Sequence, residues 1–232
     1  MQPAVDVWWT LGDHAENPRA ATTARDLTAV PLEWRRGRRG RFLADIARRS
    51  RGQAPRWSAG GSARGWRFNL SAGQHLSLTD SGRHLILAVG QGVPIGIDAE
   101  RLRPIDDPLG TLSRLGLGDL AGRLGRLGPA ARNRGFVHVW TAFEAFLKLE
   151  RLPWDAAASE FGKLQGKWLL ETSGRAYLPA GAGLPVAFAP IYVIPGIVLT
   201  VATPFSCRIE ARRWEVCPGG HPGEDFTHHT AG

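Results

Sequence analysis

The sequence predicts an α/β fold of the α+β kind, built from two similar lobes with a cleft between them. In each lobe we expect a small, mostly antiparallel sheet packed on a long helix. Short apolar segments rich in β-branched residues are separated by turn signals, which favours strands. The two halves are also alike, because in each a very apolar strand follows a glycine-containing turn, at 81–89 and at 195–202. We place the lobes at 1–105 and 106–210.

The first lobe begins with an apolar segment and ends with an acidic one. Phe42, Leu43 and Ile46 recur at helical spacing and predict a helix over 40–50. The glycine-rich residues 51–65 are typical of a loop. We expect a turn at 80–82 and strands over 5–10, 66–70, 75–78, 85–89 and 94–100.

The second lobe is organised around a helix predicted over 136–151, whose apolar residues follow a period of 3.6 and which Pro153 ends. Residues 106–133, rich in Leu, Gly and Arg, predict no definite element. The uncharged stretch 176–206 is long enough to cross a membrane, but its five prolines favour strands instead. We expect strands over 168–171, 186–194 and 197–203, and disorder over 211–232.

The composition narrows the class of protein. The 29 Lys and Arg residues against 21 Asp and Glu give a formal net charge of +8, and eight arginines fall within 35–51. Such a cluster attracts phosphates, acidic proteins or nucleic acid, although a solvated helix face explains it equally well. Two cysteines without metal-type spacing argue against a disulfide framework or a structural zinc site. Without a signal-peptide pattern, we expect a cytoplasmic protein with no membrane association.

Two carboxylates end a short apolar strand. Asp98 and Glu100 are two residues apart, so on a strand both point to the same side. A pair of acids on one face suits a hard divalent cation, which prefers oxygen ligands. The alternative is that both face solvent and pair with Arg101 and Arg103.

A third carboxylate, Glu144, lies on the predicted helix four residues before Lys148 and shares a face with it. The simplest interpretation is a surface ion pair. Large apolar neighbours such as Phe143 and Leu147 argue that the pair is not far out in water. Lys148 is also one of only three lysines in an arginine-rich chain, which favours a need for a compact ammonium group.

The chain resembles the 4′-phosphopantetheinyl transferases of the two-lobed, surfactin-synthetase-activating type. The residues that carry the resemblance are Gly96-Ile97-Asp98-Ala99-Glu100 and, some forty residues later, Trp140-Thr141-xx-Glu144-Ala145-xx-Lys148. It extends over about residues 4–205. The resemblance implies a monomeric, magnesium-dependent enzyme that moves the phosphopantetheine arm of coenzyme A to a serine of an acidic acyl or peptidyl carrier protein.

The resemblance also implies roles for individual residues. Asp98, Glu100 and Glu144 match the magnesium ligands of the family. Glu144, or a water that it holds, would also take the proton of the incoming serine. Lys148 matches the lysine that steadies the diphosphate of coenzyme A.

Further coenzyme A contacts are implied outside these two motifs. Arg41 and Arg64 lie where the family places the groups that hold the 3′-phosphate. Thr79, Asp80 and Ser81 align with a Ser-His-Ser segment whose histidine contacts the phosphates.

Two positions depart from the family pattern. Asp80 stands where the family has histidine, and Phe143 stands where it has lysine. Each change removes a cation from an anion-binding site, which weakens a charge-assisted contact. The alternative function is therefore a catalytically weak or inactive member that binds a carrier protein or coenzyme A. A basic nucleic-acid-binding protein is the less favoured alternative.

Overall fold

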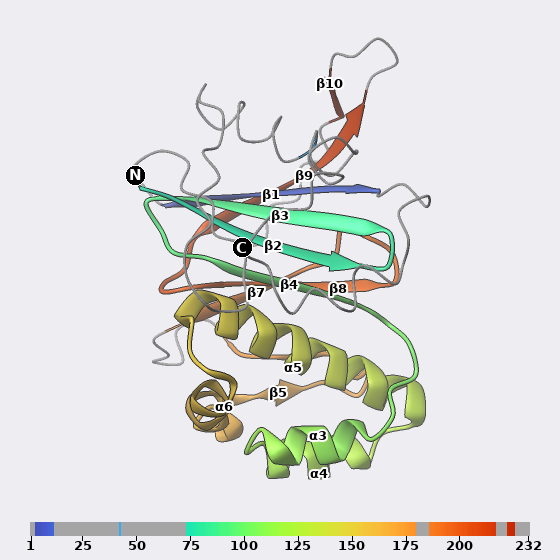
Figure 1. Cartoon of the computed structure of the whole chain (residues 1–232). Helices are drawn as coiled ribbons and strands as arrows, with labels where there is room; N and C mark the ends of the chain where they lie inside the picture. The colour runs from blue at the N-terminus through green and yellow to red at the C-terminus, as the bar shows by residue number, and fades with distance from the viewer. Residues whose placement is uncertain (1–2, 12–41, 43–72, 180–185, 217–221, 226–232) are drawn as a thin grey trace.

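The computed structural model describes residues 3–11, 42, 73–179, 186–216 and 222–225 (Figure 1). Within these ranges the chain is a mixed α/β protein, which confirms the predicted class. Two main sheets and a layer of helices are stacked on one another, and a short hairpin lies among the helices (Figure 1).

The first sheet joins strands from both ends of the chain. Its order is β10-β9-β1-β3-β2, and every pairing is antiparallel except that β1 runs parallel to β9. Gly82, with a φ of 60°, makes the tight turn between β2 and β3, a backbone conformation that favours glycine. The strands are β1 (Ala4–Leu11), β2 (Gln74–Ser81), β3 (His84–Gln91), β9 (Arg208–Val216) and β10 (Pro222–Asp225).

The second sheet is antiparallel and has the order β4-β8-β7. The apolar, β-branched strand β8 is buried along its whole length, as the sequence predicts for a central strand. The strands are β4 (Gly96–Arg101), β7 (Ala187–Ile191) and β8 (Ile197–Thr203); β5 (Leu169–Leu170) and β6 (Ala176–Tyr177) form the separate short hairpin.

The helices lie on the side of the second sheet that faces away from the first (Figure 1). The longest, α5, packs directly on β4 and β8, and the shorter helices pack on α5. None of the helices in the described ranges combines the length and hydropathy needed to cross a membrane. The helices are α3 (Pro108–Arg114), α4 (Gly118–Gly125), α5 (Pro129–Glu150) and α6 (Trp154–Gly162), followed by the 3-10 turn η1 (Gln165–Lys167).

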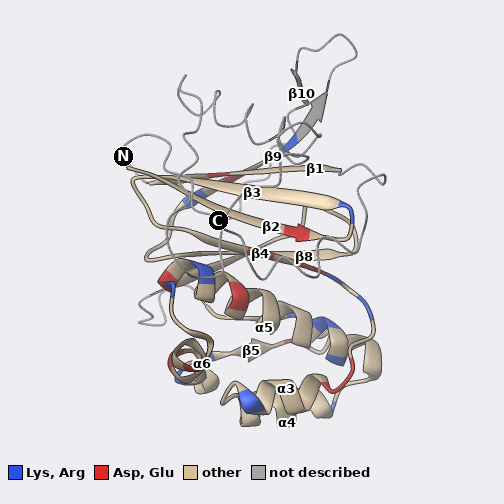
Figure 2. Cartoon of the chain, in the orientation of Figure 1, with Lys and Arg blue, Asp and Glu red and all other residues tan. Residues whose placement is uncertain are grey.

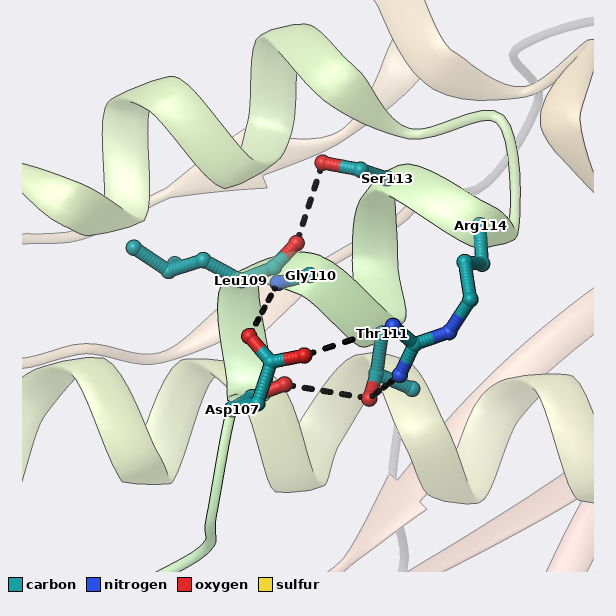
Figure 3. Close-up of polar contacts among 6 residues, drawn as sticks. All are labelled: Asp107, Leu109, Gly110, Thr111, Ser113 and Arg114. Carbon is teal, nitrogen blue, oxygen red and sulfur yellow. Dashed lines mark hydrogen bonds and ion pairs between the residues drawn. The ribbon is translucent and has the colours of Figure 1, made fainter.

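The start of α3 shows why a helix forms where the sequence analysis predicted no definite element. Asp107 caps it: its Oδ1 accepts a hydrogen bond from the Gly110 amide at 3.0 Å, and Pro108 occupies the first turn (Figure 3). Arg114 reaches back to Asp107 Oδ2 at 3.3 Å and to the Thr111 hydroxyl at 2.8 Å. The Asp-Pro pair is a recognisable start signal that the Leu-, Gly- and Arg-rich composition obscured.

Three apolar clusters hold the layers together. One lies between the two sheets and includes Val7, Ile97 and Leu199. A larger one lies between the second sheet and the helices. In the third, Phe42 is fully buried against residues of the first sheet, on the face opposite the second sheet. The second sheet is therefore covered on both faces.

The structure differs from the sequence predictions in the tail, and some predictions cannot be compared with it. Residues 211–216 continue β9, and 222–225 form β10, so the prediction of disorder is wrong for these segments. The long helix begins seven residues earlier than predicted, because Gly128 and Pro129 start it. The predicted helix over 40–50, apart from Phe42, the loop over 51–65 and the strand over 66–70 lie outside the described residues.

Gly96 allows α5 to approach β4 closely. A Cβ atom at this position would overlap the carbonyl oxygen of Ala145 and would lie 2.8 Å from the Leu149 amide nitrogen. Both atoms belong to the helix backbone, which cannot move aside as a flexible side chain can. The first residue of the acidic strand is therefore glycine because a helix lies against it.

Gly96→Ala is expected to lower the free energy of unfolding by about 1–3 kcal/mol, because it forces the helix away from the strand. Gly122→Ala is the matched control. Gly122 is an exposed residue of α4 with no atom within 4 Å of its Cβ position, so alanine there should stabilise by about 0.5–1 kcal/mol. Urea unfolding of both variants measures the difference. Equal effects at the two positions would contradict the close approach.

Candidate functional site

The acidic strand β4 presents different residues on its two faces. Ile97 and Ala99 belong to the apolar cluster between the sheets. Because side chains alternate along a strand, Asp98 and Glu100 lie on the other face, which Gly96 shows to be the face toward α5. Figure 2 shows that charged residues occur along α5, the helix that packs on β4.

Asp98 is the centre of a polar cluster in which three elements meet. The ammonium group of Lys148, on α5, donates to Asp98 Oδ1 at 2.8 Å and to the Ile97 carbonyl oxygen at 2.8 Å. The Thr79 hydroxyl, on β2, donates to the same Oδ1 at 3.0 Å. The side chains of Lys148 and Asp98 are only 20% and 11% exposed, so this is a largely desolvated ion pair.

Lys148 therefore does not form the surface ion pair with Glu144 that the four-residue spacing suggests. Its ammonium group reaches across the helix-sheet interface to residues fifty positions earlier in the chain. The large apolar neighbours of Lys148 correctly indicated a shielded face, whereas the four-residue spacing suggested only a surface partner. Neither pattern carried information about a partner on another element.

Strand β2 contributes hydroxyl groups that the sequence analysis did not connect with Asp98. Ser77 lies two residues before Thr79 on β2. Its Oγ accepts a hydrogen bond from the Ile97 amide at 3.0 Å. Ser77 and Thr79 are buried and alternate with Leu76 and Leu78, which pack in the cluster on the opposite face of the sheet. This alternation of hydroxyl and apolar residues is the signal that could have revealed the polar face.

Glu100 lies in surroundings that disfavour its charge. Burial raises the pKa of its carboxyl group, and the negative charges of Asp98 and, more weakly, Asp80 raise it further. Arg103 acts in the opposite direction. Among the described residues, no ion pair joins Glu100 to Arg101 or Arg103, so the alternative of two surface acids paired with these arginines does not describe the site.

Glu144 lies above the same strands. Thr141, Glu144 and Lys148 form one stripe along α5. Thr141 Oγ1 lies 2.8 Å from Thr200 Oγ1, and Thr200 is opposite Asp98 in the β4-β8 ladder. Because the residues on either side of Glu144 in the stripe both contact the sheet, Glu144 is directed toward β4 and β8, and its side chain is half-buried.

The carboxylates suit a hard cation in chemistry but do not form a closed cage. Asp98 and Glu100 share a face, offer oxygen ligands and repel each other, which a divalent cation would relieve. Among the described residues, however, no three His, Cys, Asp or Glu side chains come together closely enough to hold a metal ion. The two carboxylates of β4 therefore fit magnesium in their chemistry, whereas Glu144 does not complete a group of three with them.

Thr79 belongs to this cluster, whereas Asp80 and Phe143 point away from it. Thr79 and Asp80 point to opposite faces of β2, and Asp80 is exposed whereas Ser81 is buried. Phe143 is fully buried among aromatic rings, 5.4 Å from Trp154 and 5.2 Å from Phe161 between ring centroids. The position that the family fills with lysine thus faces the helical core here.

Two predicted contacts to coenzyme A cannot be placed. Arg41 and Arg64 lie outside the described residues, as does the rest of the arginine cluster over 35–51.

Comparison with known proteins adds no relative. No protein-family model matches the chain. The curated proteins contain no significant match to it either.

Glu100→Gln is expected to stabilise the metal-free protein at neutral pH. The folded state raises the pKa of Glu100 above its ordinary value of 4.5, so it binds this proton more tightly than the unfolded state does. Ionisation of Glu100 above its pKa therefore lowers the free energy of unfolding of the wild-type protein. The variant has no carboxyl group at this position and does not lose this stability. The stability difference should be small at about pH 4 and larger at about pH 7 in urea unfolding. A difference that does not change with pH would contradict the assigned surroundings.

Proposed function

We propose that the protein is a magnesium-dependent 4′-phosphopantetheinyl transferase that acts on an acyl or peptidyl carrier protein. The observation that carries the proposal is the contact between Lys148 and Asp98. These residues belong to two motifs about forty residues apart, each a weak signal alone. A largely desolvated ion pair that joins them supports a single site made of both.

The proposed reaction transfers a phosphoryl-linked arm to a hydroxyl group. The serine oxygen of the carrier protein bonds to the phosphorus that bears the pantetheine, the bond to the second phosphate breaks, and 3′,5′-adenosine diphosphate leaves. Glu144, or a water held by it, accepts the serine proton. Lys148 would balance negative charge on the diphosphate.

Asp98 and Glu100 are the proposed magnesium ligands, with Glu144 as a third. A magnesium ion held there would offset the negative charge of the diphosphate and of the leaving phosphate. The raised pKa of Glu100 supports this assignment, because it reflects burial together with excess negative charge at the site. An acid that only faces solvent would be neither buried nor placed beside other negative charges.

The finer features of the fold and setting belong to the same proposal. It includes two related lobes with a cleft between them, a monomeric enzyme and a cytoplasmic location, where coenzyme A and carrier proteins are available. The net charge of +8 supports acidic partners, since it speeds association with coenzyme A and with an acidic carrier protein.

The expected result is transfer of one phosphopantetheine arm. Purified protein mixed with coenzyme A, Mg²⁺ and an apo carrier protein should raise the mass of the carrier by one arm in mass spectrometry. Glu144→Gln should slow transfer by at least about 10²-fold, because it removes the general base. Glu150→Gln, at an exposed acid of the same helix, is the matched control and should transfer normally. No mass gain across a panel of carrier proteins would refute the proposal.

The second candidate is a family member that binds its partners but transfers slowly or not at all. Asp80 favours it, because the histidine of the family is replaced by an acid that adds to the negative charge around Glu100. The outward direction of Asp80 and the core position of Phe143 favour the active enzyme instead, since neither change removes a cation from beside Asp98.

Calorimetry should separate the two candidates. For the enzyme we expect coenzyme A to bind more tightly when Mg²⁺ is present, because a metal held by Asp98 and Glu100 would attract the anionic diphosphate. Binding of the carrier protein without any response to coenzyme A would favour the interaction module. Binding to DNA with a steep salt dependence, and no response to coenzyme A, would instead support the nucleic-acid alternative.

A further inference from the structure

Two edge strands meet beside the acidic pair. β2 is the last strand of the first sheet, and β4 is the last strand of the second. The two strands lie side by side (Figure 1). In the described part of the chain, no backbone ladder joins them. Something other than regular strand pairing must therefore fix the position of the acidic strand against the first sheet.

Two side-chain hydroxyls of β2 provide this connection. Ser77 accepts a hydrogen bond from the backbone amide of Ile97, and Thr79 donates one to the carboxylate of Asp98, each at 3.0 Å. All four residues involved are buried, so the bonds are shielded from competition with water. One bond fixes the strand backbone, and the next fixes the carboxylate that the strand carries.

Asp98 is thus held from two sides through one oxygen. Thr79 donates to Oδ1 from β2, and Lys148 donates to the same atom from α5. Among the described residues, Oδ2 accepts no hydrogen bond. The two donors differ in charge: the ammonium group offsets the negative charge of the carboxylate, whereas the hydroxyl orients the carboxylate without adding a charge.

We infer that Thr79 and Ser77 are positioning residues that hold the acidic strand and orient Asp98 for metal binding. This inference rests on the proposed function, because it takes Asp98 as a metal ligand. It gives Thr79 a different role from the coenzyme A contact that the family resemblance implies. The hydroxyl has a single proton, and that proton is donated to Asp98.

The test measures direct binding of Mn²⁺ to the full-length protein. Electron paramagnetic resonance detects the bound Mn²⁺, and no coenzyme A or carrier protein is added. Thr79→Val removes the hydroxyl with little change in shape and should weaken Mn²⁺ binding about tenfold. Thr79→Ser keeps the donor and should bind within about twofold of the wild type. Ser77→Ala should weaken binding in the same direction, because it releases the strand backbone.

Thr203→Val is the matched control. Thr203 is also a buried threonine, and its hydroxyl donates to the Phe205 carbonyl oxygen at 2.7 Å, without a contact to β4 acids. A purely structural role for Thr79 would give the two valine variants the same loss of stability and the same unchanged Mn²⁺ affinity. That result would overturn the inference.

Further outcomes keep the inference separate from the proposed function. Weakened Mn²⁺ binding in Thr79→Val with rescue in Thr79→Ser supports the positioning role even if the wild-type protein transfers nothing. Normal transfer by the wild type with unchanged Mn²⁺ binding in Thr79→Val overturns the positioning role and leaves the transferase proposal intact. If Thr79→Val does not fold, unchanged Mn²⁺ binding in Ser77→Ala overturns the inference.

Discussion

The candidate site depends on a carboxylate that is taken out of water between a sheet and a helix. An ionised Asp98 would be strongly destabilising in this position if Lys148 did not reach it, because a buried charge without a partner carries a large desolvation cost. The ammonium group also satisfies the Ile97 carbonyl oxygen, so a single side chain fixes both the strand and its acid. The close contact at Gly96 makes this possible by bringing the helix within reach. The close packing on α5, the hydrogen bonds of Lys148 and the charge of Asp98 therefore all involve the short strand β4.

The site also lies where the two halves of the chain exchange strands. β4 comes from the first half but pairs with β8 from the second, while β9 from the second half pairs with β1. The acidic strand is consequently held by elements of both halves: β8 beside it and α5 over one face come from the second half, and β2 at its free edge comes from the first. A site at such a junction is sensitive to the relative position of both sheets, and it does not belong to either half alone.

Local elements were predictable from the sequence, whereas their partners were not. The apolar run of β8 and the helical period of α5 predicted these elements correctly, because burial imposes a pattern on each segment separately. The apolar neighbours of Lys148 also indicated that it is shielded, whereas the pattern around Asp98 left a solvent-facing acid open. These patterns did not show that Asp98 and Lys148 bind each other, since a contact between distant segments leaves no periodicity in either one. The hydroxyl of Thr79 was similarly visible as a residue but not as the donor to Asp98.

The parallel pairing of β1 with β9 has a consequence for how the protein forms during synthesis. β1 leaves the ribosome long before β9, which is one of its two neighbours in the sheet. The β1-β3-β2 ribbon must therefore wait with an open edge, which is the kind of surface that pairs with other chains. Contacts between the ends of a chain also close a large loop, and this slows folding. The nascent protein is thus open to association at this edge until β9 is released.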